Sequence, residues 1–367
     1  MMEWEWQDAG VPSRMPYPVN WTSMVTSMRD VGMTMIVIQQ LEYKQLNSED
    51  ATPLYKVSDT VPAKPREDDT TEKILSAAGR DMTVFMGLVD AEGWGPTVFD
   101  GPADKLENYL LNEKTGLANK NIAAADRIWA LYHRHESFKA WYIPLEIWNF
   151  NLPENDPENR KKKIDMLRRF WRKIADHLTL LDQKDNKKRK VAIAPYFNPD
   201  LAGPKATEDL YAELLRDSGI EILMLQDGVG AHSDMDWQTV RNYYQAFGTA
   251  CKKAKVVLWA DTEIYQSKRR PADIERLKQQ LTVESEYTDT AIAWDFYQYM
   301  NPVVDDCCFD DQGQVKCKNP TDPSLICVSK NGNEIINASA KDRRTLYEAY
   351  KKLIARDVPQ VLKRRRN

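Results

Sequence analysis

Two glutamates stand directly behind apolar runs in the middle and in the second half of the chain. Glu146 ends the run FKAWYIPLE (138–146), and Glu263 ends KVVLWADTE (255–263). Two carboxyl groups that flank a glycosidic bond can hydrolyse it, one as proton donor and the other as nucleophile or base. The pair therefore indicates glycoside hydrolysis. The simpler interpretation makes both glutamates surface acids where strands leave the core.

Polar and aromatic residues gather at the carboxyl ends of the other apolar runs. Sugar rings stack on aromatic side chains, while Asp, Asn and Gln side chains hydrogen-bond to hydroxyl groups. Such a set suits carbohydrate, and we expect Trp94, Trp148 and Trp294 to face the ligand, with packing in the core as the alternative for each. Other members of the set include Gln39, Asp90, Tyr196, Asn198, Gln226, Asp227 and Asp261.

The elements that must hold these residues alternate between two hydrophobic periods. Apolar runs without strict alternation, typical of parallel strands covered on both faces, occupy 33–39, 82–89, 138–145, 190–197, 220–226, 255–261 and 290–297. Stripes with helical spacing lie at 20–31, 68–79, 103–133, 157–181, 206–217, 237–253, 271–282 and 341–355. Asn20 is a candidate N-cap, and Gly32 and Gly79 are candidate helix stops.

This alternation predicts an α/β fold with a parallel sheet, and the number of units favours a closed (β/α)8 TIM barrel over an open doubly wound sheet. The missing strand would be EWEWQ (3–7), which precedes the first helix. No G-x-G-x-x-G or P-loop motif follows any run. Barrels of this kind keep their active sites at the carboxyl ends of the strands. Glu146 and Glu263 would then end the fourth and seventh strands of a single domain, residues 1–367.

Two long polar segments leave the same face of the predicted barrel. Residues 41–67 follow the second strand and 298–340 follow the eighth, and we expect both to shape substrate selectivity. The later segment holds four of the five cysteines: Cys307, Cys308, Cys317 and Cys327. Adjacent cysteines bridge each other poorly, so we expect Cys307 and Cys308 each to form a disulfide with Cys317 or Cys327. Free or metal-bound thiols are the alternative.

Composition is ordinary for a globular protein with a large core, at 42% hydrophobic and 29% charged residues. The net charge of −4 comes from interspersed acids and bases, so we expect no nucleic-acid partner. No run approaches the ~18 apolar residues that cross a membrane. The start MMEWEWQDAG lacks the basic and apolar regions of a signal peptide. Together with the clustered cysteines, this leads us to expect an extracellular protein whose leader is absent from this chain.

Five segments resemble an uncharacterised family of glycoside-hydrolase-like barrels that is described as a domain of unknown function. They are W-x-x-M-V-x-x-M-R-D-V-G-M-T-x-I-V-I-Q (21–39), AWYIPLE (140–146), APYFNP (194–199), LQDGVG (225–230) and WADTEIY (259–265). The family is similar to the large clan of retaining sugar-cleaving barrels. The resemblance implies that Glu146 is the acid/base and Glu263 the nucleophile. It also implies a substrate cleft lined by Gln39, Tyr196, Gln226, Asp227 and Asp261.

Two other functions stay open beside a retaining glycoside hydrolase that cleaves a polysaccharide or exopolysaccharide. This clan often carries Asn before the acid, where this chain has Leu145. Leucine cannot make the hydrogen bond that the Asn side chain gives to the sugar 2-hydroxyl. The first alternative is therefore a barrel that binds carbohydrate without cleaving it. The second is a metal-dependent hydrolase or deacetylase. It would use four side chains: Asp227, His232, Asp261 and Glu263. The pair His133 and His135 precedes the fourth strand, on the opposite face. We expect no metal and no other cofactor.

Overall fold

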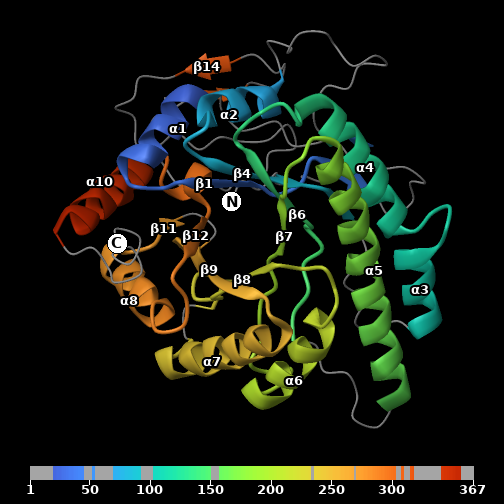
Figure 1. Ribbon diagram of the computed structural model, residues 1–367. Helices are drawn as coiled ribbons and strands as arrows, with labels where there is room; N and C mark the ends of the chain where they lie inside the picture. Colours follow the sequence, from blue (N-terminus) through green and yellow to red (C-terminus); the bar gives the residue numbers. More distant parts are fainter. Residues whose placement is uncertain are drawn as a thin grey trace.

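Seven parallel strands form the central sheet of the computed structural model (Figure 1). Their spatial order follows the chain: β1 (Met35–Ile38), β4 (Thr83–Gly87), β6 (Phe138–Tyr142), β7 (Lys190–Ile193), β8 (Ile222–Gln226), β9 (Val257–Glu263) and β12 (Ala291–Trp294). Every neighbouring pair is parallel. The structure describes residues 20–44, 52–53, 69–91, 102–149, 157–232, 235–267, 270–302, 307–309, 315–317 and 340–356.

Helices form a ring outside the strands (Figure 1). They are α1 (Trp21–Asp30), α2 (Thr70–Ala78), α3 (Ala103–Leu111), α4 (Leu117–Tyr132), α5 (Pro157–Lys184), α6 (Pro204–Leu215), α7 (Trp237–Ala254), α8 (Ile274–Glu284), α9 (Phe296–Tyr299) and α10 (Ala340–Arg356). The nearly closed ring of parallel strands inside a ring of helices confirms the predicted (β/α)8 barrel. The strand expected at 3–7 lies outside the described residues. None of the helices described is long and apolar enough to cross a membrane.

The helix boundaries agree with the capping residues of the sequence. The Asn20 side chain accepts a hydrogen bond from the backbone N–H of Ser23 at the start of α1. Gly32 and Gly79 follow α1 and α2 with φ of +77° and +55°, a region that residues with a Cβ rarely adopt. These predicted signals are confirmed.

The stripe at 103–133 is not one helix but two, α3 and α4. The Asn112 side chain accepts hydrogen bonds from the backbone N–H groups of Lys114 and Thr115, at 2.9 and 3.0 Å, and so closes a turn after α3. A Cβ on Gly116 would lie 2.5 Å from the Asn112 carbonyl oxygen, which permits only glycine at this close approach. Helical periodicity continues across the turn, so the stripe alone does not reveal the break.

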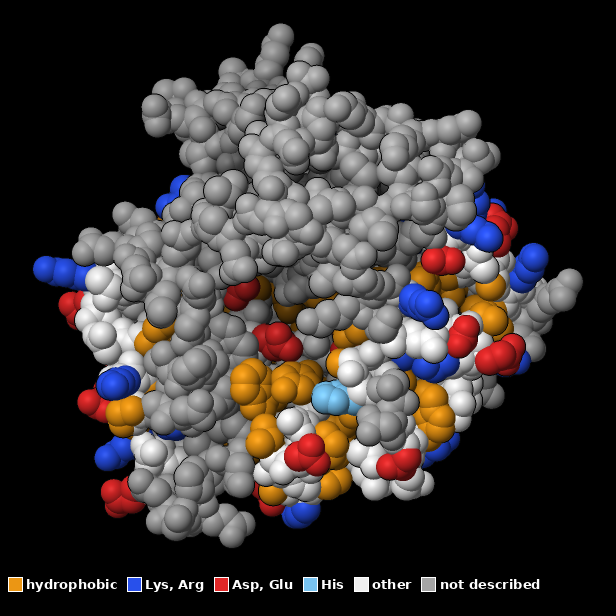
Figure 2. Space-filling model, turned by 180° about the vertical axis from the view of Figure 1, so that it is seen from behind, with side chains coloured by type: hydrophobic (Ala, Val, Ile, Leu, Met, Phe, Trp, Pro, Cys, Tyr) orange, Lys and Arg blue, Asp and Glu red, His pale blue; other side chains and the backbone are white. Residues whose placement is uncertain are grey.

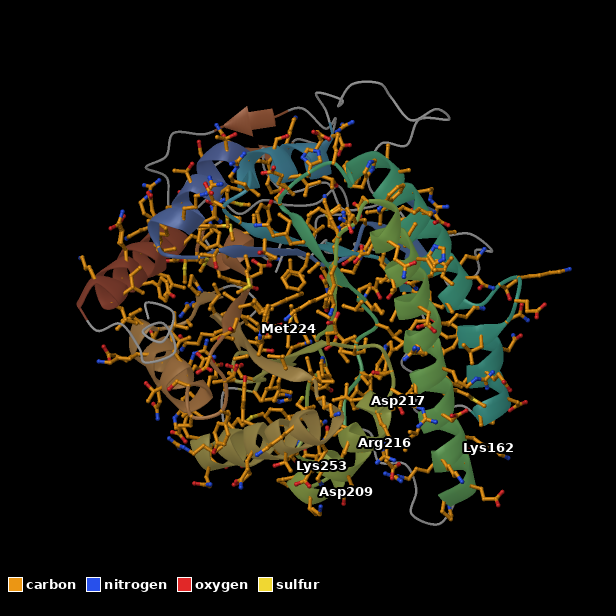
Figure 3. The ribbon with its side chains drawn as sticks, viewed as in Figure 1. Lys162, Asp209, Arg216, Asp217, Met224 and Lys253 are labelled. Carbon is orange, nitrogen blue, oxygen red and sulfur yellow. The ribbon has the colours of Figure 1, made fainter. Side chains whose placement is uncertain are left out.

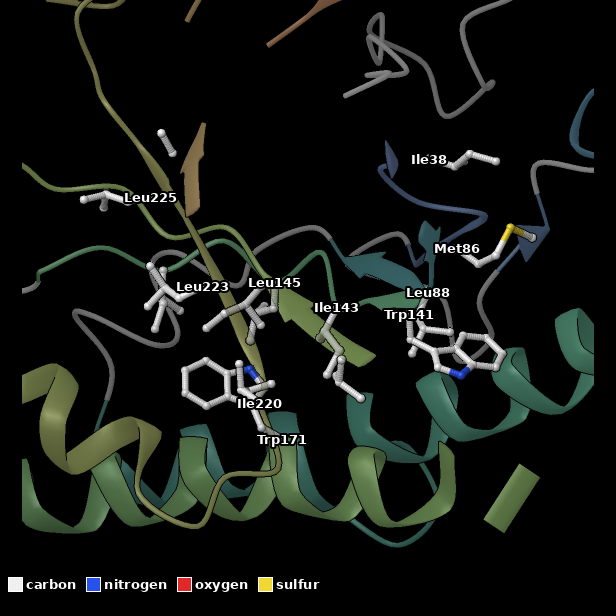
Figure 4. Close-up of a cluster of buried hydrophobic side chains, with 14 of the residues drawn as sticks. Ile38, Met86, Leu88, Trp141, Ile143, Leu145, Trp171, Ile220, Leu223 and Leu225 are labelled. Atoms are coloured by element: carbon white, nitrogen blue, oxygen red, sulfur yellow. The ribbon is translucent and has the colours of Figure 1, made fainter. Parts of the chain in front are cut away.

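Side chains along the strands alternate between two apolar clusters. One fills the barrel and contains Val37, Phe85, Ala140, Tyr142, Ala192, Ala194, Ile222, Met224 and Ile292. Figure 3 shows Met224 inside the ring, with Lys162, Asp209 and Lys253 on the surrounding helices. The intervening positions, such as Ile143, Leu145 and Leu223, pack outward beside Trp171 of α5 (Figure 4). This alternation decides which strand-end residues face the interior of the barrel.

Short strands continue the chain beyond the carboxyl ends of the barrel strands. After β1 and β4, β2 (Glu42–Lys44) pairs with β5 (Val89–Ala91) in parallel and with β3 (Thr52–Pro53) antiparallel. The segment expected to be a long loop, 41–67, therefore contains two strands. After β9, β10 (Tyr265–Ser267) pairs with β11 (Arg270–Pro271), and in the cysteine-bearing segment β13 (Cys307–Phe309) pairs with β14 (Val315–Cys317).

Candidate active site

The strand-end residues that face the barrel interior are those an even number of positions beyond the inward-facing core residues. Gln226 follows Met224 by two positions, and Glu263 follows the inward-packed Trp259 by four. Because all the strands are parallel, their carboxyl ends meet at one mouth of the barrel. The same relation holds for Gln39, Glu146, Tyr196, Asp261 and Trp294. The structure therefore brings Glu146 and Glu263 to the same end of the barrel.

Glu146 lies in an extended segment that continues β6 alongside the chain after β7. The Ile143 N–H donates to the Ala192 carbonyl at 2.9 Å, and the Tyr196 N–H donates to the Ile147 carbonyl at 3.1 Å. The Gln226 amide donates to Glu146 Oε1 at 3.3 Å. Desolvation raises the pKa of Glu146 to about 6, against this hydrogen bond from Gln226, which lowers it.

A second carboxyl group, that of Asp90 on β5, lies within electrostatic reach of Glu146. Desolvation raises the pKa of Asp90 to about 7; the Ala91 N–H opposes this shift, and the negative charge of Glu146 adds to it. Asp90 is one of the strand-end acids of the sequence, but it was not among the residues expected to line the cleft. It gives the site a further group that holds a proton near neutral pH.

An aromatic pair borders Glu146. Trp148 and Tyr196 form an isolated parallel bridge, and their rings lie 5.4 Å apart at a tilt of 53°. Both side chains are partly exposed. Desolvation, together with the charge of Glu146, raises the pKa of Tyr196, so its hydroxyl stays protonated and can donate a hydrogen bond. The pair combines an apolar surface with a polar group beside the candidate acid.

Glu263 ends β9, and the loop after β8 surrounds its carboxylate. The Ala231 N–H donates to Oε2 at 2.8 Å, and the Gly230 N–H donates to the same carboxylate. A Cβ on Gly230 would lie 2.9 Å from Oε2 and 2.6 Å from the Tyr265 carbonyl, so glycine alone allows this close approach. Burial raises the pKa of Glu263 to about 8; the charge of Asp227 adds to the shift, and both N–H groups oppose it.

Asp261 lies one inward step before Glu263 and is completely buried. Among the residues that the structure describes, neither of its carboxylate oxygens has a hydrogen-bond partner. Burial raises the pKa of Asp261 to about 7, and the charges of Asp227, Glu146 and Asp295 add to the shift. The mouth thus holds several carboxyl groups that retain protons well above the range of ordinary acids.

Two other expected site residues, Asp227 and Asn198, occupy different positions, and a third lies outside the described residues. Asp227 follows Gln226 by one position, so it faces outward, and it is fully buried behind the mouth. Asn198 serves a turn after β7: its Oδ1 accepts from the Asp200 N–H, and its own N–H donates to Asn149. Trp94 lies outside the described residues. Because successive side chains of a strand point to opposite faces of the sheet, Asp227 points away from the mouth, toward which its neighbour Gln226 points.

Helix α8 contributes polar groups to the site that the sequence analysis did not identify. Gln280 and Glu284 are buried, and Gln280 donates to Asp227 and to the Glu263 carbonyl. Their spacing from the buried Leu277 and Leu281 places them on the core-facing side of the helix. Polar residues at core-facing positions of an apolar stripe were the available signal.

Seen from the side opposite to Figure 1, acidic side chains lie next to a group of hydrophobic ones in the recessed middle of the molecule (Figure 2). Within the described ranges, no three His, Cys, Asp or Glu side chains are placed to hold one metal ion. His232, proposed in the metal-dependent alternative, follows the Gly228 turn and donates its backbone N–H to the Gly228 carbonyl.

The comparisons with known proteins agree with this architecture. The family described as a domain of unknown function, DUF4434, matches residues 11–306. The chain belongs to this family. The resemblance noted in the sequence is thereby confirmed, whereas no curated protein matches the chain.

Solved structures share the fold of this DUF4434 member at low sequence identity. A candidate α-L-fucosidase from Bacteroides thetaiotaomicron is 15% identical with a TM-score of 0.54, over 77% of this chain and 83% of that one. An endo-β-1,4-mannanase from Thermotoga petrophila is 13% identical with a TM-score of 0.51, over 94% of this chain and 76% of that one. A structure of the hyperthermostable endo-1,4-β-D-mannanase from Thermotoga petrophila RKU-1 gives the same identity and TM-score, over 92% and 96%. These similarities show that the chain shares the barrel fold of those structures.

Proposed function

We propose that the protein is a retaining glycoside hydrolase that cleaves a polysaccharide or exopolysaccharide. The observation that carries this proposal is the placement of Glu146 and Glu263 at inward positions of the same barrel mouth, three strands apart in the sheet. Such a pair can act from two sides of one glycosidic bond. Carboxyl groups ~5–5.5 Å apart support retention, and ~6.5–9.5 Å supports inversion.

In the first step, Glu146 donates its proton to the glycosidic oxygen while the bond from that oxygen to the anomeric carbon breaks. A carboxylate oxygen of Glu263 forms a bond to the anomeric carbon, which gives a covalent glycosyl-enzyme. In the second step, the Glu146 carboxylate takes a proton from water, and the water oxygen attacks the anomeric carbon. The bond to Glu263 breaks, and both carboxyl groups return to their starting states.

The pKa values of the two glutamates affect both the population of the reactive form and the reactivity of Glu263. The pKa values, about 6 for Glu146 and about 8 for Glu263, make the form with Glu146 protonated and Glu263 ionised a minority near neutral pH. The ionised Glu263 is nevertheless more basic than an ordinary carboxylate because its pKa is raised, and its nucleophilicity rises with its basicity. The N–H groups of Gly230 and Ala231 stabilise the ionised form that the reaction requires.

The aromatic pair Trp148 and Tyr196 suggests where the leaving group binds. Because Glu146 protonates the departing oxygen, the leaving sugar lies on the side of Glu146, where these two rings are. We propose that its ring stacks on this pair. Gln39 and Trp294, at inward positions across the mouth, would contact the sugar that becomes bonded to Glu263; Trp94 would join them from the segment after β5.

We also propose that the protein is extracellular and that its cysteine-bearing segment carries at least one disulfide. In the antiparallel pair β13–β14, Cys307 lies directly opposite Cys317. Opposed residues on antiparallel strands have Cα atoms ~4.5–5.5 Å apart, which suits a disulfide. Of the pairings left open by the sequence, this register favours Cys307–Cys317.

Digestion of a panel of glycans with the wild type and with Glu146→Gln and Glu263→Gln tests the proposal. We expect the wild type to release fragments from one class of glycan, with each variant ~10³-fold slower or more on the same glycan. Equal activity of either variant would contradict the assigned roles. Calorimetric binding of an oligosaccharide without cleavage by the wild type would instead support the non-catalytic alternative that Leu145 raised.

A further inference from the structure

We propose that Asp227 and Glu284 form a buried carboxyl pair that shares a single proton and acts as a positioning unit for Glu263. The catalytic consequence rests on the proposed function, because it assumes that Glu263 is the nucleophile. The structural claim stands on the hydrogen bonds that each carboxyl group receives, together with the effect of each group on the ionisation of the other. Both residues are fully buried; Asp227 occupies an outward position at the end of β8, and Glu284 lies on the core-facing side of α8.

The hydrogen bonds of Asp227 are those of an ionised carboxylate. Its Oδ1 accepts from the N–H groups of Val229 at 3.1 Å and Glu263 at 3.4 Å, and its Oδ2 accepts from the Gln280 amide. Burial raises the pKa of Asp227, and the hydrogen bonds from Gln280 and Val229 oppose that shift. A carboxylate is an acceptor only, so three N–H donors favour the charged form. The Asp227 and Glu284 carboxyl groups are also hydrogen-bonded to each other.

Two ionised carboxylates cannot hydrogen-bond, so this contact requires one proton, and the partners of Glu284 place it there. Glu284 Oε2 accepts from the Thr262 hydroxyl at 2.7 Å, while Oε1 receives no hydrogen bond from the residues described. An Oε1–H that donates to Asp227 accounts for both facts. Burial and the adjacent charge of Asp227 raise the pKa of Glu284 well above its ordinary value, which agrees with a neutral Glu284.

The pair acts on Glu263 through the backbone. Asp227 accepts from the Glu263 N–H, and Gln280 links Asp227 to the Glu263 carbonyl, to which it donates at 3.1 Å. Arg276 donates to the same carbonyl at 3.0 Å. The peptide groups on both sides of the Glu263 Cα are thereby fixed to α8, which limits where its carboxylate can point.

The ionised Asp227 also acts on the charge of Glu263. Its negative charge, second only to burial, raises the pKa of Glu263. The titratable and charged groups that face this pair come from α7, α8, β9 and β10: Tyr244, Arg276, Asp261, Glu263 and Tyr265. Arg276 is the cation that the described residues bring to this group.

Two substitutions separate a shared proton from two independent acids. In Glu284→Gln, the amide donates to Asp227 and its oxygen accepts from Thr262, so the neutral, donating state becomes permanent. In Asp227→Asn, the charge disappears, and the new amide N–H group opposes the Gln280 donor. The first variant should leave Glu263 as it is, and the second should make Glu263 lose its proton at lower pH.

The test is carboxyl ¹³C NMR of the full chain labelled at glutamate, with Glu263 and Glu284 assigned from Glu263→Gln and Glu284→Gln. We expect Glu284 to stay protonated through the titration of Glu263, whose midpoint stays in place in Glu284→Gln and moves toward acid in Asp227→Asn. Titration of Glu284 in the ordinary range of glutamate in the wild type would overturn the proposal. So would an acid shift of Glu263 in Glu284→Gln, because it would mean that a charge was removed.

The NMR titration tests the shared proton by itself, and enzyme kinetics test whether Asp227 affects catalysis. If the enzyme cleaves a glycan, Asp227→Asn should move the descending limb of kcat/KM, which the pKa of Glu263 sets, to lower pH, because Glu263 becomes less basic. A plateau that falls with no movement of the limb would reduce Asp227 to a structural role. If no glycan is cleaved, the proposed function fails, while the titration still decides the proton-sharing claim.

Discussion

Replacement of Glu146 with glutamine should make the ionisation of Glu263 visible in the rate. An aryl glycoside whose phenolate departs without a proton does not need Glu146 in the first chemical step. For Glu146→Gln on such a substrate, kcat/KM then follows the ionised fraction of Glu263. Burial and Asp227 raise the pKa of Glu263 to about 8, so at lower pH most molecules hold a protonated, unreactive nucleophile.

The size of the effect follows from this value. Well below its midpoint, the ionised fraction of an acid falls ~10-fold for each pH unit, so with a pKa of about 8 roughly 1% of Glu263 is ionised at about pH 6. From there to about pH 8, kcat/KM should rise ~50-fold and then level off. An ordinary glutamate, with a pKa of ~4.3, would be fully ionised over this range and would give a flat profile.

The assay is initial release of the phenol at substrate concentrations well below KM, from about pH 5 to about pH 9. Glu263→Gln should be inactive on the same substrate at every pH. Glu213→Gln is the matched control: its exposed side chain pairs with Arg160 on the outer surface, and it should give the wild-type profile. A flat profile for Glu146→Gln, or activity that persists in Glu263→Gln, would refute the reasoning.

Three further expectations follow from the same geometry. Gly230→Ala should push the loop after β8 away from Glu263 and so remove the N–H donors to its carboxylate. Steady-state kinetics should then show kcat lowered ~10²-fold or more, and calorimetry should show little change of the melting temperature. Full activity would mean that the loop plays no part. Asp261 keeps its proton up to about pH 7 when folded but only to ~3.9 when unfolded, so the stability that it gives at low pH is lost as pH rises between these values. Asp261→Asn should therefore have a higher free energy of unfolding than the wild type at pH 8, by up to ~4 kcal/mol, and the difference should be smaller at pH 5. The same difference at both pH values would contradict the buried charge. Mass spectrometry of a non-reduced digest should find Cys307 linked to Cys317, and a link from Cys307 to Cys327 would contradict the β13–β14 register.

The sequence predicted the barrel well because each strand is an apolar run and each helix an apolar stripe, with caps where the chain turns. Asn20 and Gly79 mark helix ends that the structure confirms. The sequence did not predict the break between α3 and α4 at Gly116, because a turn of five residues between the two helices keeps nearly the same hydrophobic spacing. The two strands within 41–67 escaped because they are too short for any period to show.

The sequence predicted which residues stand at the strand ends, but not which of two adjacent residues faces the mouth of the barrel. Glu146, Gln226 and Glu263 could be placed at strand ends from the runs alone. Which of two adjacent residues, Gln226 or Asp227, faces the mouth depends on the register of β8 against its neighbours, which hydrophobic runs covered on both faces do not reveal. The spacing within α8 marks Gln280 and Glu284 as core-facing polar residues, but the groups that they contact depend on long-range packing, which the spacing does not give.

The most direct test of the central claim is to trap the glycosyl-enzyme. A 2-fluoro glycoside of the sugar found in the glycan digest slows the second step, and peptide mass spectrometry then locates the added mass. We expect one glycosyl unit on the peptide that contains Glu263, and none in Glu263→Gln. Label on another acid, or a first product of inverted anomeric configuration with no label, would contradict a retaining reaction carried by Glu146 and Glu263.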